Sequence, residues 1–233
     1  MRPRSLLLLV ALLLGVTALV AASPVDARAP PTPVCGVCEL DRTTADGPSV
    51  TAGESSLTVT LHGNGSTTWE ARVDLAAGSD VLAANESLRR AVVSDAVRDG
   101  IAEPRDVDSR VDGDALVVDY RDPNATERHL GAVVFTPLTP AAPRNPIAIG
   151  GEGSRYLAAD RLTVRGGSGW EVRGDAPAAD SDGSLVWSRE EVERDDAQRV
   201  PLDVDRDPVA VEAGAVLPGV RTWFARLLTD DSL

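Results

Sequence analysis

The sequence predicts a mainly β protein of the α+β class, with antiparallel β-sandwich-like lobes, one amphipathic helix in the N-terminal half and a short C-terminal helix. From Ser55 onward, short segments of alternating apolar and polar residues recur between Gly, Asp, Asn and Pro residues. This alternation is typical of half-buried strands. In the body of the chain, apolar residues at helical spacing occur between Leu88 and Val97 and after Pro218, which predicts the two helices.

Residues 1–22 have the pattern of a secretory signal. Arg2 and Arg4 precede an apolar run that ends at Ala22, and we predict cleavage after that residue. Because the run is about 17 residues long, at the short limit for spanning a bilayer, an uncleaved N-terminal membrane anchor is the alternative. In either case we expect the body of the chain to be extracellular, either secreted or held at the cell surface.

Residues 23–54 are predicted to form a proline-rich spacer ahead of the folded body. The spacer contains both cysteines of the chain, Cys35 and Cys38. We interpret them as a local disulfide or a passive thiol pair, because thiols tend to oxidise outside the cell. An intermolecular bridge, half of a metal site and a redox-active pair are the alternatives. A disulfide that closes so small a loop beyond the spacer is expected to contribute little to stability.

Residues 55–138 are predicted to form an α+β lobe. Its expected elements are a hairpin, a helix, a second hairpin and a strand, at 57–61 with 69–75, 88–97, 107–111 with 116–120, and 130–135. Gly63-Asn64-Gly65 and Asp112-Gly113 supply the turn chemistry of the two hairpins. Gly100 favours the left-handed conformation that ends a helix.

Residues 139–146 are rich in proline and are predicted to connect the first lobe to a β-rich lobe at 147–216. The strands expected in this second lobe are short and separated by turns, at 161–165, 170–173, 185–188, 200–204 and 209–213. Residues 217–233 are predicted to be a C-terminal amphipathic helix or tail, with Val220, Phe224 and Leu227 on one face.

The charge of the chain restricts its partners and its environment. The formal net charge is −13, and all 23 basic residues are arginine. A negative field of this size repels nucleic acid and anionic lipid, so neither is expected as a partner. An acidic excess without lysine is typical of proteins that work in molar salt, where self-repulsion is screened within about 3 Å.

Three of the four asparagines begin a glycosylation sequon: Asn64, Asn85 and Asn124. In a chain with an export signal, this enrichment predicts N-glycosylation at exposed turns. The alternative is that these residues are turn asparagines that happen to precede Ser and Thr.

We identify no catalytic, cofactor-binding or metal-binding residues in the sequence. The two histidines, His62 and His129, have no ligand spacing to the cysteines and stand in no nucleophile motif. Asp203, Asp205 and Asp207 alternate as calcium ligands could, but the glycine and glutamate of a calcium loop are missing, which favours a solvated strand edge. Tryptophans can form carbohydrate platforms, although those at 69 and 187 stand at strand period and are predicted to be core residues.

The order of these elements resembles the ectodomain of an uncharacterised family of haloarchaeal surface proteins. The resemblance covers about Ser55 to Gly214 and rests on the hairpin, the helix, Asp160-Arg161-Leu162-Thr163-Val164, Gly169-Trp170 and Asp182-Gly183-Ser184-Leu185-Val186-Trp187. It implies a surface or sensing role. Those relatives commonly continue into a C-terminal transmembrane helix, whereas this chain has a short amphipathic segment there.

The sequence therefore predicts a non-enzymatic extracytoplasmic protein that contacts an unknown envelope or surface protein. The alternative is a module that binds a small ligand or a glycan, and a hydrolase or thiol oxidoreductase is the third hypothesis. A pocket lined by tryptophan and carboxylates would favour the second. A histidine within hydrogen-bond reach of a serine or cysteine would favour the third.

Overall fold

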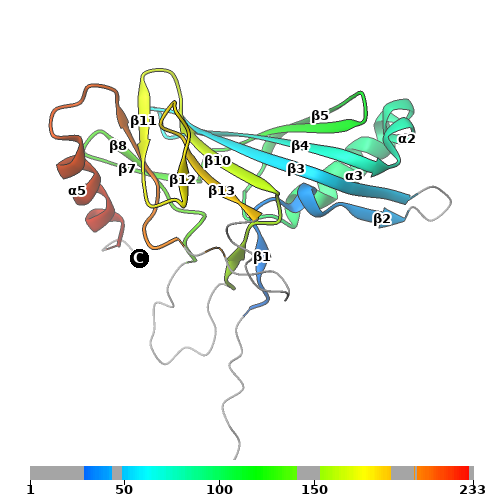
Figure 1. Cartoon of the computed structure of the whole chain (residues 1–233), viewed down its shortest axis with the longest axis horizontal. Coiled ribbons are helices and arrows are strands. Elements are labelled where there is room, and N and C mark those ends of the chain that lie inside the picture. The colour runs from blue at the N-terminus through cyan, green and yellow to red at the C-terminus, as the bar shows by residue number, and fades with distance from the viewer. Residues whose placement is uncertain (1–28, 44–48, 141–152, 190–201, 203, 231–233) are drawn as a thin grey trace, which may run out of the picture.

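The computed structural model describes residues 29–43, 49–140, 153–189, 202 and 204–230. The predicted signal at 1–22 lies outside the described residues. The protein is mainly β, with helices that include a short one near the C-terminus, as predicted. Its strands form a large sheet, a small sheet and one isolated parallel pair (Figure 1).

The large sheet has the order β12-β13-β10-β3-β4-β6-β5, with β2 added beside β3. Its strands are β2 (Asp41–Thr43), β3 (Ser49–Leu61), β4 (Thr67–Ala77), β5 (Arg105–Asp112), β6 (Ala115–Asp122), β10 (Arg161–Gly166), β12 (Ala178–Ala179) and β13 (Leu185–Ser188). All its pairs are antiparallel except β10 with β3, which is parallel. The sheet is therefore mixed rather than purely antiparallel.

The small sheet has the order β11-β14-β8-β7 and is antiparallel throughout. Its strands are β7 (Thr126–His129), β8 (Ala132–Phe135), β11 (Trp170–Arg173) and β14 (Val209–Glu212). The isolated pair is β1 (Thr32–Pro33) with β9 (Arg155–Tyr156). The helices are η1 (Gly36–Glu39), α2 (Ser79–Ala84), α3 (Glu86–Arg98) and α5 (Pro218–Asp230). In Figure 1, α2 and α3 lie at one end of the large sheet, and α5 lies at the other, beyond the small sheet.

Both predicted hairpins are present, because alternation and turn chemistry agree in them. In the first, Val59 pairs with Trp69, and the apolar side chains of both strands enter the core. In the second, Gly113 takes a φ of 62° at the turn between β5 and β6, which a glycine adopts without steric cost. Trp69 then contacts Phe135 of β8 with ring centroids 5.7 Å apart, so the core joins the two sheets.

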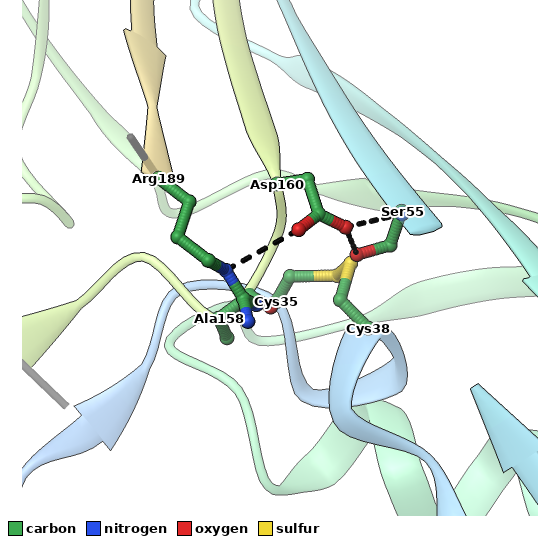
Figure 2. The surroundings of a disulfide bond; sticks show 6 residues. All are labelled: Cys35, Cys38, Ser55, Ala158, Asp160 and Arg189. Carbon is green, nitrogen blue, oxygen red and sulfur yellow. Dashed lines mark hydrogen bonds and ion pairs between the residues drawn. A yellow bond between two sulfur atoms is a disulfide. The ribbon is translucent and has the colours of Figure 1, made fainter. Parts of the chain in front are cut away.

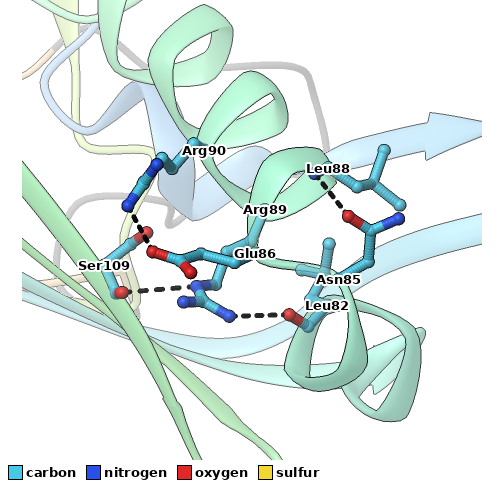
Figure 3. A network of polar contacts seen from close by, with 7 residues as sticks. All are labelled: Leu82, Asn85, Glu86, Leu88, Arg89, Arg90 and Ser109. Carbon is cyan, nitrogen blue, oxygen red and sulfur yellow. Dashed lines mark hydrogen bonds and ion pairs between the residues drawn. The ribbon is translucent and has the colours of Figure 1, made fainter.

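Helix α3 confirms the predicted helix, and its start is fixed by a side chain. The Asn85 Oδ1 atom accepts a hydrogen bond of 2.9 Å from the backbone N–H of Leu88 (Figure 3), which satisfies a donor left unpaired at a helix start. Arg89 donates to the backbone carbonyls of Leu82 and Ser109 and so ties α3 to α2 and β5. The sequence analysis missed α2, as well as strand β7.

The predicted boundary at 139–146 does not separate two lobes in the structure. Strands β10, β12 and β13, from the second half of the chain, extend the sheet formed by β3 to β6. Conversely, β7 and β8 from the first half pair in one sheet with β11 and β14. Residues 141–146 of the connection lie outside the described residues. Local patterns predict where strands are but not which strands pair, and this is why the division was wrong.

The segment predicted as a spacer is part of the fold from Thr32 onward. Its apolar residues Val34, Val37 and Leu40 are at most 2% exposed, and the long strand β3 begins at Ser49. Its strand β1 pairs with β9, more than a hundred residues later. Proline bias is a local signal, and the partner that holds this segment is supplied by tertiary structure.

Cys35 and Cys38 form a disulfide, and both are buried in the main core. Asp160 organises the polar side of this region (Figure 2). Its Oδ2 atom accepts hydrogen bonds from the backbone N–H and the hydroxyl of Ser55, at 2.7 and 3.2 Å, and its Oδ1 atom lies 3.3 Å from Arg189 Nε. These contacts join the start of β10 to β3 and to the end of β13.

One further strand prediction was wrong. The segment 200–204 was expected to be a strand, but Leu202 and Val204 are not in one. Leu202 instead buries its side chain, and its N–H donates to the carbonyl of Arg155 at 2.6 Å. Residues 200, 201 and 203 lie outside the described residues.

Candidate binding surface

Helix α5 packs on the small sheet with its small residues and presents its large apolar residues to solvent. Thr222, Ala225 and Thr229 are at most 6% exposed, and their spacing places them on one face of the helix. The opposite side carries Val220, Trp223, Phe224, Leu227 and Leu228, which are 38–60% exposed. The usual orientation of an amphipathic helix, with its large apolar face toward the core, is reversed here.

The buried face of α5 consists of small residues, which allow the helix to lie close to the sheet. Ala225 forms a second core cluster with Ala132, Val134, Val209 and Val211 of β8 and β14. The hydroxyls of Thr222 and Thr229 donate to carbonyls one turn earlier in the same helix, at 2.9 and 3.0 Å. Each buried hydroxyl is therefore satisfied without a partner in the sheet.

Exposed apolar side chains are concentrated around this helix. Among the described residues, the exposed large hydrophobic residues are Val107, Leu130, Val216, Leu217, Val220, Trp223, Phe224, Leu227 and Leu228. All but the first two belong to α5 or to the two residues that precede it. Leu130 stands next to Gly131, where an added Cβ would lie 3.7 Å from the Arg221 side chain of α5. We call the exposed residues of 216–228 the α5 surface.

The α5 surface lies in a segment of the chain that has no carboxylates. Residues 213–229 contain no Asp or Glu, although the whole chain contains 36. They contain Arg221 and Arg226. The surface is therefore apolar and locally basic on a protein of net charge −13.

A cleft of about 580 Å³ opens at one edge of the α5 surface. It is lined by Arg173, Gly174, Asp175, Arg206, Gly219, Thr222, Trp223, Arg226 and Leu227. Arg226 is held by the backbone, since its Nε donates to the Asp207 carbonyl at 2.9 Å and its Nη2 to the Arg173 carbonyl at 3.5 Å. The cleft is therefore lined by three arginines and a tryptophan.

No local pattern in the sequence predicts this cleft. Arg173, Arg206 and Arg226 come from three separate segments, and only the tertiary structure brings them together. Residues 213–229 contain no carboxylate, but the longer segments 1–25 and 128–151 contain none either, so this property does not single out the cleft. The apolar positions Val220, Phe224 and Leu227 were predicted to share one helical face, and the structure turns that face outward.

The three sequon asparagines are exposed, and each lies in a defined local structure. Asn64 Oδ1 accepts from the N–H and the hydroxyl of Ser66, at 3.0 and 2.8 Å. Asn85 caps α3. Asn124 Nδ2 donates to Glu103 Oε2 at 2.8 Å.

Each histidine lies beside a polar side chain. His62 Nε2 lies 2.8 Å from the Thr68 hydroxyl, and His129 Nε2 lies 3.2 Å from Glu127 Oε2. Trp69 and Trp187 are buried in the core, as predicted, whereas Trp223 is 60% exposed.

Among the residues that the structure describes, Tyr120, Asp182 and Arg110 have shifted pKa values, and none of the three lines the cleft. Burial raises the pKa of the Tyr120 hydroxyl far above its usual range, with a further contribution from Asp122. Hydrogen bonds from Ser184 lower the pKa of the exposed Asp182 carboxyl, which caps a turn. The hydrogen bond to Asp119 raises the pKa of Arg110.

Within the part of the chain that the structure describes, no group of three or more His, Cys, Asp and Glu residues could hold a metal ion. None of the helices in that part has the length and apolar character needed to cross a bilayer. Asp203 lies outside the described residues, and Asp207 accepts a hydrogen bond from Thr139. Comparison with known protein families, with curated proteins and with solved structures finds no match to this chain.

Proposed function

We propose that this chain is a non-enzymatic extracytoplasmic protein that contacts a protein of the cell envelope through the α5 surface. The observation that carries the proposal is the reversed orientation of α5, which exposes Trp223, Phe224 and Leu228 while its small residues face the sheet. Apolar side chains gathered in this way, on an otherwise polar surface, mark sites of macromolecular contact.

Export is supported by features in separate parts of the chain. The segment 1–22 has the composition of a secretory signal. The Cys35–Cys38 disulfide fits an oxidising compartment, and the three sequon asparagines are exposed. The acidic composition and the resemblance to haloarchaeal surface proteins support a high-salt environment.

The charge of the α5 surface favours a protein partner with apolar side chains and carboxylates at its contact. Arg221 and Arg226 stand beside the apolar residues, and no acidic residue occurs between 213 and 229. A second copy of the chain would bring arginine against arginine, with no carboxylate between 213 and 229 to pair with it.

The proposal can be tested by crosslinking in intact cells. A photo-crosslinking amino acid replaces Phe224 or, as a matched control, Val107, which is also exposed but lies on the distant strand β5. We expect one exported protein to be captured from position 224 and not from position 107. Its binding to the purified chain should then weaken about tenfold or more in Leu228→Asp.

Three results would refute this function. They are recovery of the photo-crosslinkable protein in the cytosolic fraction, crosslinks from position 224 only to lipid or to a second copy of the chain, and equal capture of the partner from positions 224 and 107. The stability of Leu228→Asp serves as a control, since Leu228 is 38% exposed and its loss opens no cavity in the core.

A further inference from the structure

We infer that the cleft beside α5 binds an acidic saccharide, with its carboxylate held by arginines and its ring stacked on Trp223. This inference goes beyond the proposed partner contact, because the cleft residues Arg173 and Arg206 are not part of the α5 surface. The cleft volume of about 580 Å³ is in the range of small-ligand sites.

Two of the cleft arginines, Arg173 and Arg206, form only weak ion pairs. Arg206 Nε lies 3.8 Å from Asp175 Oδ2, beyond hydrogen-bond distance, and both side chains are more than half exposed. Arg173 Nη2 lies 3.5 Å from Glu171 Oε2, at the limit of a hydrogen bond. Exposed pairs of this length contribute little, so both groups can form the parallel bidentate contact that arginine makes with a carboxylate.

Convergence of three arginines is not what the composition of the chain predicts. Acidic residues outnumber basic residues by 36 to 23, yet the cleft is lined by three arginines and one carboxylate. In molar salt the Debye length is about 3 Å, so only anions in direct contact are attracted. The cleft offers contacts of that kind.

The other lining residues favour a saccharide over a bare anion. Trp223 presents an exposed aromatic surface at the cleft, which can cover the apolar C–H face of a sugar ring. Asp175 can accept hydrogen bonds from sugar hydroxyls, which a bare inorganic anion does not offer. A ligand with a carboxylate, hydroxyls and an apolar ring face satisfies all three kinds of group, and a uronate sugar has this chemistry.

Gly219 provides a way to close the cleft without disturbing the fold. It lines the cleft near the start of α5, and a Cβ built there would meet no atom within 4 Å. A leucine at this position would therefore extend into the space that the ligand needs. This variant changes no charge, so it complements Arg206→Gln, which removes the charge and keeps a polar side chain.

The experiment is a titration of the full chain in molar NaCl with trigalacturonic acid, followed by calorimetry and tryptophan fluorescence. Of the four tryptophans, Trp69 and Trp187 are buried, Trp170 is half-buried and Trp223 is 60% exposed. A ligand-dependent change in fluorescence that is lost in Trp223→Phe therefore reports on Trp223. Parallel titrations use galactotriose, which has the same length and no charge, and inorganic sulfate. Arg121→Gln on the exposed face of β6 is the matched control for loss of one arginine.

We expect one trigalacturonate to bind per chain, with affinity about tenfold weaker in Arg206→Gln and Gly219→Leu, as loss of one strong contact implies. Arg121→Gln and Phe224→Asp should bind normally, and Arg206→Gln should still crosslink to the envelope partner, so the two proposals fail separately. Equal affinity for galactotriose, equal affinity for sulfate, no binding of trigalacturonate, or unchanged binding in both cleft variants would each overturn the inference.

Discussion

Gly36 lies against the last turn of α3 so closely that a Cβ at this position would be 2.1 Å from the backbone oxygen of Ala96. The same Cβ would lie 2.7 Å from the backbone nitrogen of Gly100. Gly36 is the residue that follows Cys35, so the disulfide-bonded turn and the C-terminal end of α3 meet with only backbone between them. The glycine of the Cys-Gly-Val-Cys sequence is therefore required by packing.

We predict that Gly36→Ala lowers the free energy of unfolding by about 1–3 kcal/mol, the usual cost of overpacking. The obstacle is backbone, which cannot turn aside as a flexible side chain would. Gly219→Ala is the control, because a Cβ there has open space, and its stability should be unchanged or slightly higher. Chemical denaturation measures both, and equal stability of the two variants would contradict the packing shown here.

Replacing both cysteines is expected to destabilise the protein, contrary to the prediction from the sequence. Loss of the crosslink costs about 2 kcal/mol for so short a loop, which Cys35→Ala with Cys38→Ala measures. The double serine variant should lose more, by about 1–3 kcal/mol for each buried hydroxyl without a partner. Thermal melts of the two double variants decide this, and an unchanged melting temperature in both would place the disulfide outside the core.

The stability of α3 should depend on Asn85 as a cap and not on its sequon. Asn85→Ala removes the acceptor of the Leu88 N–H and is expected to cost about 0.5–2 kcal/mol. Ser87→Ala removes the sequon, keeps the cap and changes an exposed residue, so its stability should match the parent in unglycosylated protein. An equal loss in both variants would show that the cap bond is not what matters.

Tyr120 should make the protein sensitive to alkaline pH. Burial raises the pKa of its hydroxyl in the folded state, whereas the unfolded value is near 10. Folding therefore favours the neutral hydroxyl. Its contribution to the free energy of unfolding is complete below a pH of about 10 and is lost as the pH rises above that value. Melting temperatures between about pH 8 and 11.5 should fall less steeply for Tyr120→Phe than for the parent, and parallel curves would refute the effect.

Stability is expected to rise with salt. At a net charge of −13, repulsion extends over a Debye length of about 30 Å at 0.01 M salt and only about 3 Å at 1 M. The ion pairs that salt would weaken are exposed, as for Arg42 and Asp95 at 41% and 58% exposure, and such pairs contribute little. Circular dichroism across a KCl titration checks this, and a melting temperature independent of salt would remove the basis for a high-salt adaptation.

Short-range patterns predicted much of the secondary structure. The hairpin of β3 and β4, the helix α3, and the strands β11 and β13 follow the sequence closely, because alternation, turn residues and capping act within a few positions. Segments such as α2 and β7 lack a clear apolar period and were missed. The strand predicted around Leu202 was wrong, because an apolar residue in a turn-rich region can be buried without belonging to a strand.

Local patterns predicted most of the elements of this protein, and its acidic charge, cysteine pair and sequons are properties of the sequence alone. Tertiary structure alone decided that the segment around Cys35 enters the core, that β10 lies parallel to β3, and that α5 turns Trp223 outward. It also decided that Arg173, Arg206 and Arg226 share one cleft. The physical reason is that periodicity and turn chemistry are set by neighbours in the chain, whereas burial and convergence depend on partners that lie up to a hundred residues or more away.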